Sequence, residues 1–577
     1  MIPYRTLCLA SALFVLVVAS VPLPGHVSRA PEQVSVPAQP PVAGPVVARV
    51  SFAGQADLNR LASALDVWEV HHAEGYLVAL LRPDQVAALL QAGYRVEMDE
   101  AQTALLGRRL RPLRGQAAGI PGYPCYRTVE ETAADLARLA AGHPDLVAWV
   151  DIGDSWEKAV GSRPGYDLYA LVLTNRAVPG PKPRFFLMAA AHARELATAE
   201  LAGRFAEYLV ANYGTAPDVT WLLDYFEVHV VPMANPDGRK VAEAGEYWRK
   251  NTDDDDGCIA LPYYGTDLNR NSNFHWGGDS TNPCDETYQG PSAASEPETQ
   301  AIQNYVASLF PDQRGPDDED PAPDDALGVV ITLHSYSELV LSPYGFRSTP
   351  APNHTQLETL GRKFGYLNGY RVCQAGEAGC LYATTGSTDD WAYGELGVAA
   401  YTFEVGTTFF QDCSYFENTI VPENFPALLY AFKAARRPYQ APAGPESLDV
   451  TSAPATVLAG FPAVLTAVTD DTRYDSGGWG NEPVQKIAAA RYTVDAPSWT
   501  TGVMSYPMSA ADGAFGAAVE TVRATVSTVG LPPGRHVLFV EGQDTDGHWG
   551  VPSAVFLRVV SVLQTLYLPL VVTQAGP

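Results

Sequence analysis

Apolar runs of strand length alternate with helix-like runs from about residue 125 to residue 437. Residues 184–190 and 226–232 are expected to be strands, and residues 129–141 are expected to be a helix. Strands that alternate with helices build an α/β structure in which helices cover a parallel or mixed sheet. We therefore expect residues 120–438 to form an α/β domain with a mixed β-sheet flanked by helices.

A smaller α/β pattern precedes this region, at residues 46–100. Its expected elements run strand, helix, strand, strand, helix, strand, and Asp57 is placed to cap the first helix. This order is that of a small ferredoxin-like domain. Four arginines follow in residues 107–114, within a linker at residues 101–119. The linker is either a processing site or an ordinary interdomain connection.

The pattern of expected elements changes after a Pro-rich linker at residues 439–446. Residues 447–565 contain short β-type runs separated by turns, a pattern typical of an immunoglobulin-like β-sandwich. A third domain is reasonable because 577 residues are more than one hydrophobic core usually organises. The C-terminal tail, residues 566–577, is apolar but too short to span a bilayer.

The N-terminus has the pattern of a signal peptide, expected at residues 1–30. Its apolar run at residues 7–21 suits a signal-peptide core and falls short of a membrane span, and a buried first element is the alternative. A flexible spacer at residues 31–45 follows. Removal of Cys8 with the signal peptide leaves six cysteines, an even number that indicates disulfides and an oxidising compartment. We expect a secreted, extracellular protein.

The charge of the chain excludes two classes of partner. Its formal net charge is −27 at pH 7, and such a surface repels nucleic acid phosphates and anionic lipid headgroups. Neither nucleic acid nor a membrane is expected as a partner.

Three potential metal ligands stand at the ends of apolar strand-like runs. His192 and Glu195 follow the run at 185–191, and His334 ends the run that includes residues 331–333. Imidazole nitrogen and carboxylate oxygen are standard zinc donors, and a catalytic zinc takes three protein ligands and leaves a position for water. Each residue alone could be structural, whereas together they predict a catalytic zinc site.

Glu404 and three arginines complete the candidate chemistry. Glu404 ends the apolar run 399–403, and a carboxylate there needs a polar pocket, a metal or a cation, because burying it unpaired is costly. Such a group can take a proton from water during attack and pass it to a leaving amine. Arg194, Arg249 and Arg270 can grip a carboxylate or stabilise an oxyanion, and the alternative for each is a surface ion pair.

Seven short motifs occur in order between residues 192 and 404: His-x-x-Glu, Asn-Pro-Asp-Gly, Trp-Arg-Lys, Asp-x-Asn-Arg-Asn, His-Ser-Tyr, Tyr-(x)8-Trp and Thr-Phe-Glu. Together they resemble the zinc metallocarboxypeptidase family typified by carboxypeptidases A, B and T. The resemblance covers about residues 121–437, and residues 46–98 are more loosely similar to the family's activation segment. It implies the zinc carboxypeptidase fold and a zymogen that removes C-terminal residues from peptides and proteins.

The resemblance also implies a role for each matching residue. His192, Glu195 and His334 would bind one Zn²⁺, with Asp267 orienting His192 and Glu404 acting as the general base. Arg249 would polarise the scissile carbonyl. The implied substrate-binding residues are Asn269, Arg270 and Tyr382 for the terminal carboxylate, and Arg194, Ser335 and Tyr336 for subsites further along the peptide. Cys258 and Cys284 match a disulfide position of the family, whereas the pairing of the other four cysteines stays open.

The resemblance places Asp389 at the floor of the pocket for the terminal side chain. A carboxylate there would pair with a terminal Lys or Arg. The alternatives are that Asp389 caps a local turn, or that a wider pocket accepts basic and apolar residues.

Other readings remain at this point. Acidic loops at residues 253–256 and 317–325 could bind calcium or could simply be solvated. The protein could be a related zinc amidopeptidase or endopeptidase that acts on cell-wall peptides, or a non-catalytic peptide-binding protein. The C-terminal domain could direct the protein to a cell surface or a polymer.

Overall fold

The computed structural model describes residues 44–161, 163–258 and 263–561. The expected signal peptide, nearly all of the expected spacer and the C-terminal tail lie outside the described residues. Three sheets organise the described part of the chain.

The N-terminal sheet has four antiparallel strands in the order β2-β3-β1-β4. Its helices and strands alternate as the sequence predicts, in the order of a ferredoxin-like unit. They are β1 (Val46–Ser51), α1 (Gln55–Ala62), β2 (Asp66–His71), β3 (Tyr76–Leu81), α2 (Pro83–Gln91) and β4 (Val96–Met98), followed by α3 (Glu100–Thr103).

The expected cap of the first helix is wrong. Helix α1 begins at Gln55, with Gly54 at the N-cap position. Asp57 therefore lies in the first turn, where its carboxylate accepts a hydrogen bond of 2.9 Å from the backbone amide of Ala53. The helix begins earlier than expected because Gly54 adopts a φ of +151°, which is accessible to glycine and disfavoured for a residue with a side chain.

The central sheet has eight strands in the order β11-β10-β12-β9-β7-β8-β6-β5. Strands β8, β7, β9 and β12 run parallel to their neighbours in that order, while β5, β6 and β10 introduce antiparallel pairs, so the sheet is mixed as expected. The strands are β5 (Val147–Asp154), β6 (Asp167–Leu173), β7 (Arg184–Ala189), β8 (Glu227–Val231), β9 (Val329–His334), β10 (Leu339–Ser342), β11 (Arg371–Gln374) and β12 (Ala399–Glu404).

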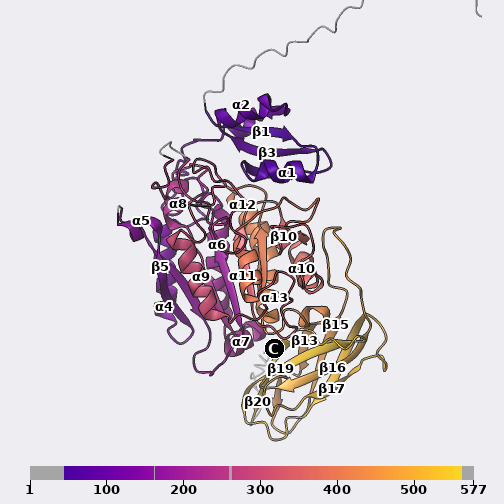
Figure 1. Cartoon of the computed structure of the whole chain (residues 1–577). Coiled ribbons are helices and arrows are strands. Elements are labelled where there is room, and N and C mark those ends of the chain that lie inside the picture. Colours follow the sequence, from indigo (N-terminus) through magenta and orange to yellow (C-terminus); the bar gives the residue numbers. More distant parts are fainter. Residues whose placement is uncertain (1–43, 162, 259–262, 562–577) are drawn as a thin grey trace, which may run out of the picture. The chain divides into compact units, whose positions relative to one another are not determined.

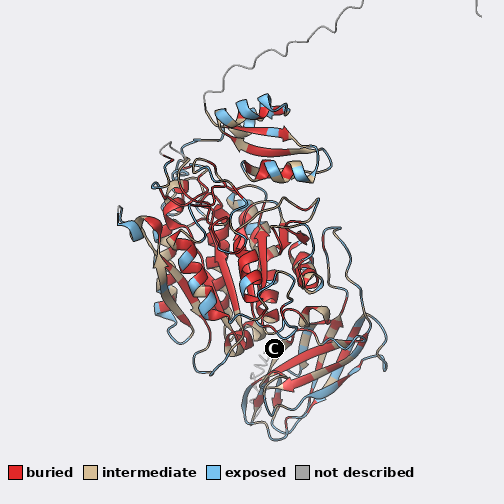
Figure 2. Ribbon diagram, viewed as in Figure 1, coloured by how far each residue is buried: buried red, intermediate tan, exposed pale blue. Residues whose placement is uncertain are grey.

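Helices pack along the central sheet (Figure 1), for example α6 against β7 and α10 against β11. The middle strands are almost wholly buried (Figure 2), which explains their unbroken apolar sequence. The helices are α4 (Val129–Gly142), α5 (Trp156–Val160), α6 (Leu196–Asn212), α7 (Pro217–Tyr225), α8 (Pro236–Glu243), α9 (Pro297–Leu309), α10 (His354–Asn368), α11 (Thr388–Leu396), α12 (Cys413–Tyr415) and α13 (Val421–Ala434).

The C-terminal part is rich in β-strands, which follow the order β13-β15-β18-β17-β16-β19-β20-β14. Strand β17 pairs with both β16 and β18, and so joins the two halves of the expected sandwich into one continuous order. Residues facing inward along these strands form a separate apolar core. The strands are β13 (Glu446–Ala453), β14 (Thr456–Leu458), β15 (Ala463–Asp470), β16 (Ile487–Val494), β17 (Tyr506–Ala510), β18 (Val519–Val526), β19 (Gly534–Asp544) and β20 (Ser553–Val560).

Three disulfides connect the six cysteines that follow the expected signal peptide. Cys258 bonds to Cys284, the pair implied by the family resemblance. The remaining bonds are Cys125–Cys413 and Cys373–Cys380, which settle the pairing that the sequence left open. No helix in the described ranges combines the length and the apolar character of a transmembrane segment.

Candidate metal and catalytic site

The candidate site lies where three parallel strands of the central sheet end. Strand β9 ends at His334 and strand β12 at Glu404, and these two residues are direct partners in the β9–β12 register. Strand β7, on the other side of β9, ends at Ala189 and leads within three residues to His192. The carboxyl ends of parallel strands share one edge of a sheet, which is where α/β proteins place their ligand sites. The fold therefore brings together residues up to 212 positions apart.

His192, Glu195 and His334 form a compact group, the candidate metal-binding group, and each of the three residues is at most 3% exposed. The Nδ1 atom of His192 lies 2.7 Å from Glu195 Oε1 and 3.1 Å from Nδ1 of His334, and His334 Nδ1 lies 3.3 Å from Glu195 Oε2. One ligand atom from each residue lies within 4.8 Å of the other two. Two imidazole nitrogens and a carboxylate that converge in this way are a donor set suited to Zn²⁺.

Asp267 supports this group from behind. Its Oδ1 atom accepts a hydrogen bond of 3.0 Å from Nε2 of His192. The other ring nitrogen of His192, Nδ1, therefore faces Glu195 and His334. Its Oδ2 atom accepts bonds of 2.9 and 2.8 Å from Nε and Nη2 of Arg249. Burial alone would raise the pKa of Asp267, but the charges of Arg249 and His192 hold it well below its usual range. The carboxylate thus stays ionised and holds both the His192 ring and the Arg249 guanidinium by hydrogen bonds.

A cavity opens in front of the metal-binding group. Its lining includes most of the residues expected at the site: His192, Glu195, Arg249, Asn269, Arg270, Ser335, Tyr336, Tyr382, Asp389 and Glu404. Burial raises the pKa of Glu404 to about 8, and the positive charges of His334 and Arg249 oppose that rise. Of the other expected residues, His334, Asp267 and Arg194 do not line this cavity.

The cavity contains a carboxylate without a partner. Asp389, in the first turn of α11, is 4% exposed and makes no hydrogen bond or ion pair with any described residue. Its neighbour Asp390 points elsewhere, and its oxygens accept hydrogen bonds from the backbone amides of Gly345 and Phe346. Leu339, Leu341 and Ala375 line the same cavity and give it apolar walls.

Arg194, which is expected in a substrate subsite, is paired with the N-terminal sheet in this structure. Two of its guanidinium nitrogens donate hydrogen bonds of 2.6 Å to the two carboxylate oxygens of Asp66, at the start of β2. Asp66 and its strand neighbours Trp68 and Glu69 are not among the residues expected at the site. Trp68 and Glu69 line the cavity, and Glu69 accepts a hydrogen bond of 3.0 Å from the Tyr336 hydroxyl. In the sequence, only the Asp-x-Trp-Glu run at residues 66–69, at the start of an expected strand, marks these three side chains.

The acidic loop at residues 253–256 is not simply solvated. Asp253 is buried, and one oxygen each of Asp253, Asp256 and Glu296 lie within 4.8 Å of one another. Burial, with the charge of Glu296, raises the pKa of Asp253 to about 7. The loop at residues 317–325 instead forms exposed ion pairs, such as Glu319 with Arg347.

Comparison with known proteins agrees with this geometry. The family model described as "Zinc carboxypeptidase" matches residues 132–424. Carboxypeptidase A2 of Rattus norvegicus is 30% identical over 330 residues, which are 55% of this chain and 72% of the relative. Carboxypeptidase B of Homo sapiens is 29% identical over 293 residues, which are 50% of this chain and 64% of the relative.

Solved structures show a similar fold. Carboxypeptidase A from Helicoverpa armigera matches with a TM-score of 0.53 and 23% identity, over 68% of this chain and 98% of that one. Thrombin activatable fibrinolysis inhibitor matches with a TM-score of 0.52 and 21% identity, over 68% and 99% of the two chains. With the family model covering half of its length, this chain belongs to the zinc carboxypeptidase family and is a zinc metallocarboxypeptidase of the A/B type.

Proposed function

We propose that the protein is a secreted carboxypeptidase zymogen whose mature form releases C-terminal Lys and Arg, and to a lesser extent apolar residues, from peptides. The observation that carries the specificity is the unpaired carboxylate of Asp389 in the active-site cavity. Export is supported by the signal-peptide pattern and by the three disulfides.

In this proposal His192, Glu195 and His334 hold the zinc ion, and Asp267 keeps His192 in the ligating tautomer. A zinc ion bound there would polarise the scissile carbonyl and lower the pKa of a water molecule. These residues would also shield the ion from bulk solvent, because all of them are buried.

Glu404 acts as the general base and then as the acid for the leaving amine. Its position opposite His334 in the β-sheet register supports this assignment, since it places the carboxylate beside the metal-binding group on a rigid strand. Arg249 stabilises the oxyanion that forms during attack. Its two hydrogen bonds to Oδ2 of Asp267 fix the guanidinium before the substrate arrives.

Asn269, Arg270 and Tyr382 bind the free carboxylate of the peptide. Arg270 is buried, and its Nε atom lies 3.3 Å from Oδ1 of Asp279. The Asp279 carboxylate therefore neutralises part of the positive charge of Arg270. The Asn269 side chain accepts a hydrogen bond from the backbone amide of Thr388, which connects this group to the helix that carries Asp389. Ser335 and Tyr336 then line subsites further along the peptide, with Arg194 once Asp66 has left.

Asp389 is proposed to select the terminal side chain. A buried carboxylate without a partner in the protein can pair with a cation, and a terminal Lys or Arg supplies one. Leu339, Leu341 and Ala375 would contact the methylene groups of the same side chain and would also accept apolar residues.

The specificity can be tested with four peptides that differ only in a terminal Arg, Lys, Leu or Phe. We expect kcat/KM to be highest for Arg and Lys. Asp389→Ala should lower the values for Arg and Lys by at least about tenfold and leave those for Leu and Phe within about twofold. A wild type that prefers Leu or Phe by more than tenfold, with no loss on Arg in the variant, would overturn the assignment.

Residues 46–100 are proposed to be the activation segment, and the linker at 101–119 the place where it is cut. Trp68 and Glu69 line the cavity, and Asp66 occupies Arg194, which supports the idea that this segment excludes substrate. Residues 120–438 would then be the mature catalytic domain, and residues 447–565 a separate β-domain connected by residues 439–446.

A further inference from the structure

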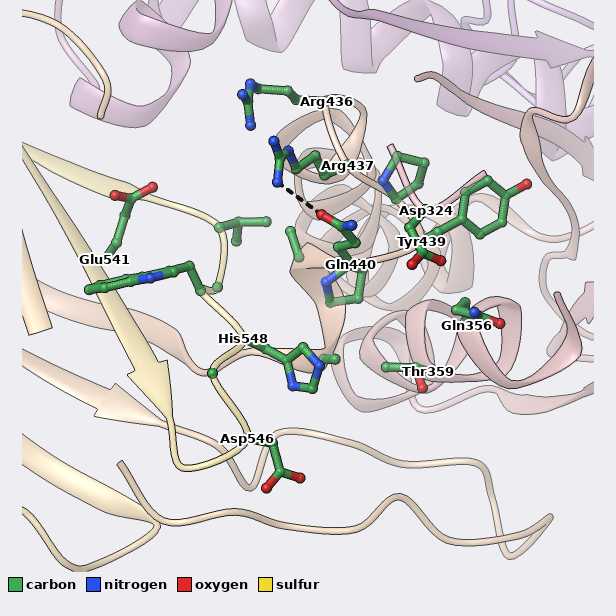
Figure 3. A pocket seen from close by; sticks show the side chains of 18 of the residues that line it. Asp324, Gln356, Thr359, Arg436, Arg437, Tyr439, Gln440, Glu541, Asp546 and His548 are labelled. Carbon is green, nitrogen blue, oxygen red and sulfur yellow. Dashed lines mark hydrogen bonds between the residues drawn. The ribbon is translucent and has the colours of Figure 1, made fainter. Parts of the chain in front are cut away.

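A second cavity, of about 710 Å³, lies between the end of α13 and the C-terminal strands (Figure 3). Its volume is within the range of small-ligand sites, roughly 300–1,000 Å³. It is lined by residues from both sides, including Arg436 and Arg437 after α13, Arg491 on β16 and Glu541 on β19. None of the residues assigned to catalysis lines it.

Arg436 and Arg437 bring two adjacent positive charges to one wall of this cavity (Figure 3). Neither forms an ion pair with a described residue. Arg437 donates a hydrogen bond of 2.9 Å to the Gln440 side chain, and Arg436 lies over the Trp499 ring at 4.6 Å. Burial, and then the charge of Arg437, lowers the pKa of Arg436 to about 10. An anion in the cavity would compensate the positive charge of both side chains.

The other cations of the lining are already neutralised by the protein. Lys433 lies 2.6 Å from Asp218, and Arg491 lies 2.7 Å from Glu541. Arg436 and Arg437 differ from these two cations in having no carboxylate partner among the described residues, although the chain has a net charge of −27 and is rich in carboxylates. Among the described lining residues, the arginine pair is therefore the positive group left for a ligand.

The remaining lining limits the charge of that ligand. Asp324 and Asp546 also line the cavity (Figure 3), and no described residue pairs with either. They would repel a doubly charged phosphate more strongly than a single carboxylate. The side-chain amides of Gln356, Gln440 and Gln485 offer neutral hydrogen bonds, which suit hydroxyl groups.

We propose that this cavity binds a sugar acid of the uronic-acid class. Its carboxylate contacts Arg436 and Arg437, and its hydroxyl groups bond to the side-chain amides. Guanidinium groups are well matched to such a ligand because they bind a carboxylate through two parallel hydrogen bonds.

Isothermal titration of the full exported chain with D-glucuronate tests this proposal. We expect a Kd below about 1 mM. D-Glucuronamide, which keeps the ring and hydroxyls but lacks the charge, should bind at least about tenfold more weakly, and D-glucose 6-phosphate should also bind more weakly. Because this comparison uses the wild type, it stands even if a variant fails to fold.

Arg436→Ala and Arg437→Ala should each weaken glucuronate binding by at least about tenfold. Arg523→Ala, an exposed arginine on β18 outside the cavity, is the matched control and should bind as the wild type does. Peptide turnover should be unchanged in all three variants. Absence of glucuronate binding, equal binding of glucuronamide, tighter binding of glucose 6-phosphate, or no effect of the two cavity substitutions would overturn the proposal.

Discussion

Arg194 is fully buried and donates one 2.6 Å hydrogen bond to each carboxylate oxygen of Asp66. Asp66 is itself supported by the indole N–H of Trp68, at 2.9 Å. This bidentate pair joins the N-terminal sheet to the rim of the active-site cavity, and it occupies an arginine that the family resemblance assigns to substrate.

The first prediction concerns this contact. Asp66→Asn should raise the activity of the uncut chain on small peptides by at least about tenfold, because removing one partner of a buried ion pair costs roughly 3–5 kcal/mol and favours the open state. The measurement is kcat/KM before and after cleavage of the linker. Glu97→Gln, an exposed residue of β4, is the control and should leave the uncut chain as inactive as the wild type. Equal activity of Asp66→Asn and Glu97→Gln would contradict the blocking role.

The same pair predicts a pH dependence. Burial alone would raise the pKa of Asp66, but Arg194 lowers it below the ordinary value of 3.8. Because the folded pKa lies below the unfolded one, the stabilisation is present above pH 3.8 and is lost as the pH falls through the folded pKa. After linker cleavage, the N-terminal segment should therefore remain bound at pH 5–7 and dissociate well below pH 4, as followed by size-exclusion chromatography. Dissociation already at pH 6 would contradict this assignment.

The third prediction concerns metal retention. His192→Ala should lose the zinc ion, since two of the three ligands do not hold it as firmly. Asp267→Asn should retain it with roughly 10- to 100-fold lower affinity, because the amide no longer orients the His192 ring in the same way. Zinc content after dialysis against graded chelator concentrations measures both. Full retention of zinc by His192→Ala would show that the ligand assignment is wrong.

Much of the central fold could be predicted from the sequence, because short segments of the chain carry the pattern of their own secondary structure. Residues 184–190 form an unbroken apolar run followed by a histidine, and such a run reads as a buried parallel strand with a polar residue at its carboxyl edge. The same reasoning applies to His334 and Glu404. Because parallel strands end at one edge of the sheet, these residues were expected to meet, and they do.

Contacts between distant segments could not be predicted in the same way. Asp66 and Arg194 are 128 residues apart, and no local pattern marks either as the partner of the other. Asp253 looked like part of a solvated acidic loop, because its burial depends on packing near Glu296. Asp57 is a residue type that often caps helices, yet Gly54 occupies the N-cap position and the helix begins at Gln55.

We propose that Glu404 provides the proton transfers of peptide hydrolysis at the metal-binding group. The most direct test is to measure the zinc content and kcat/KM of Glu404→Gln in the cleaved enzyme, with an Arg-terminated peptide. We expect one zinc ion per chain, as in the wild type, and a kcat/KM lower by about 10²–10⁴-fold, since the amide cannot accept a proton. Near-normal turnover with zinc retained would contradict it.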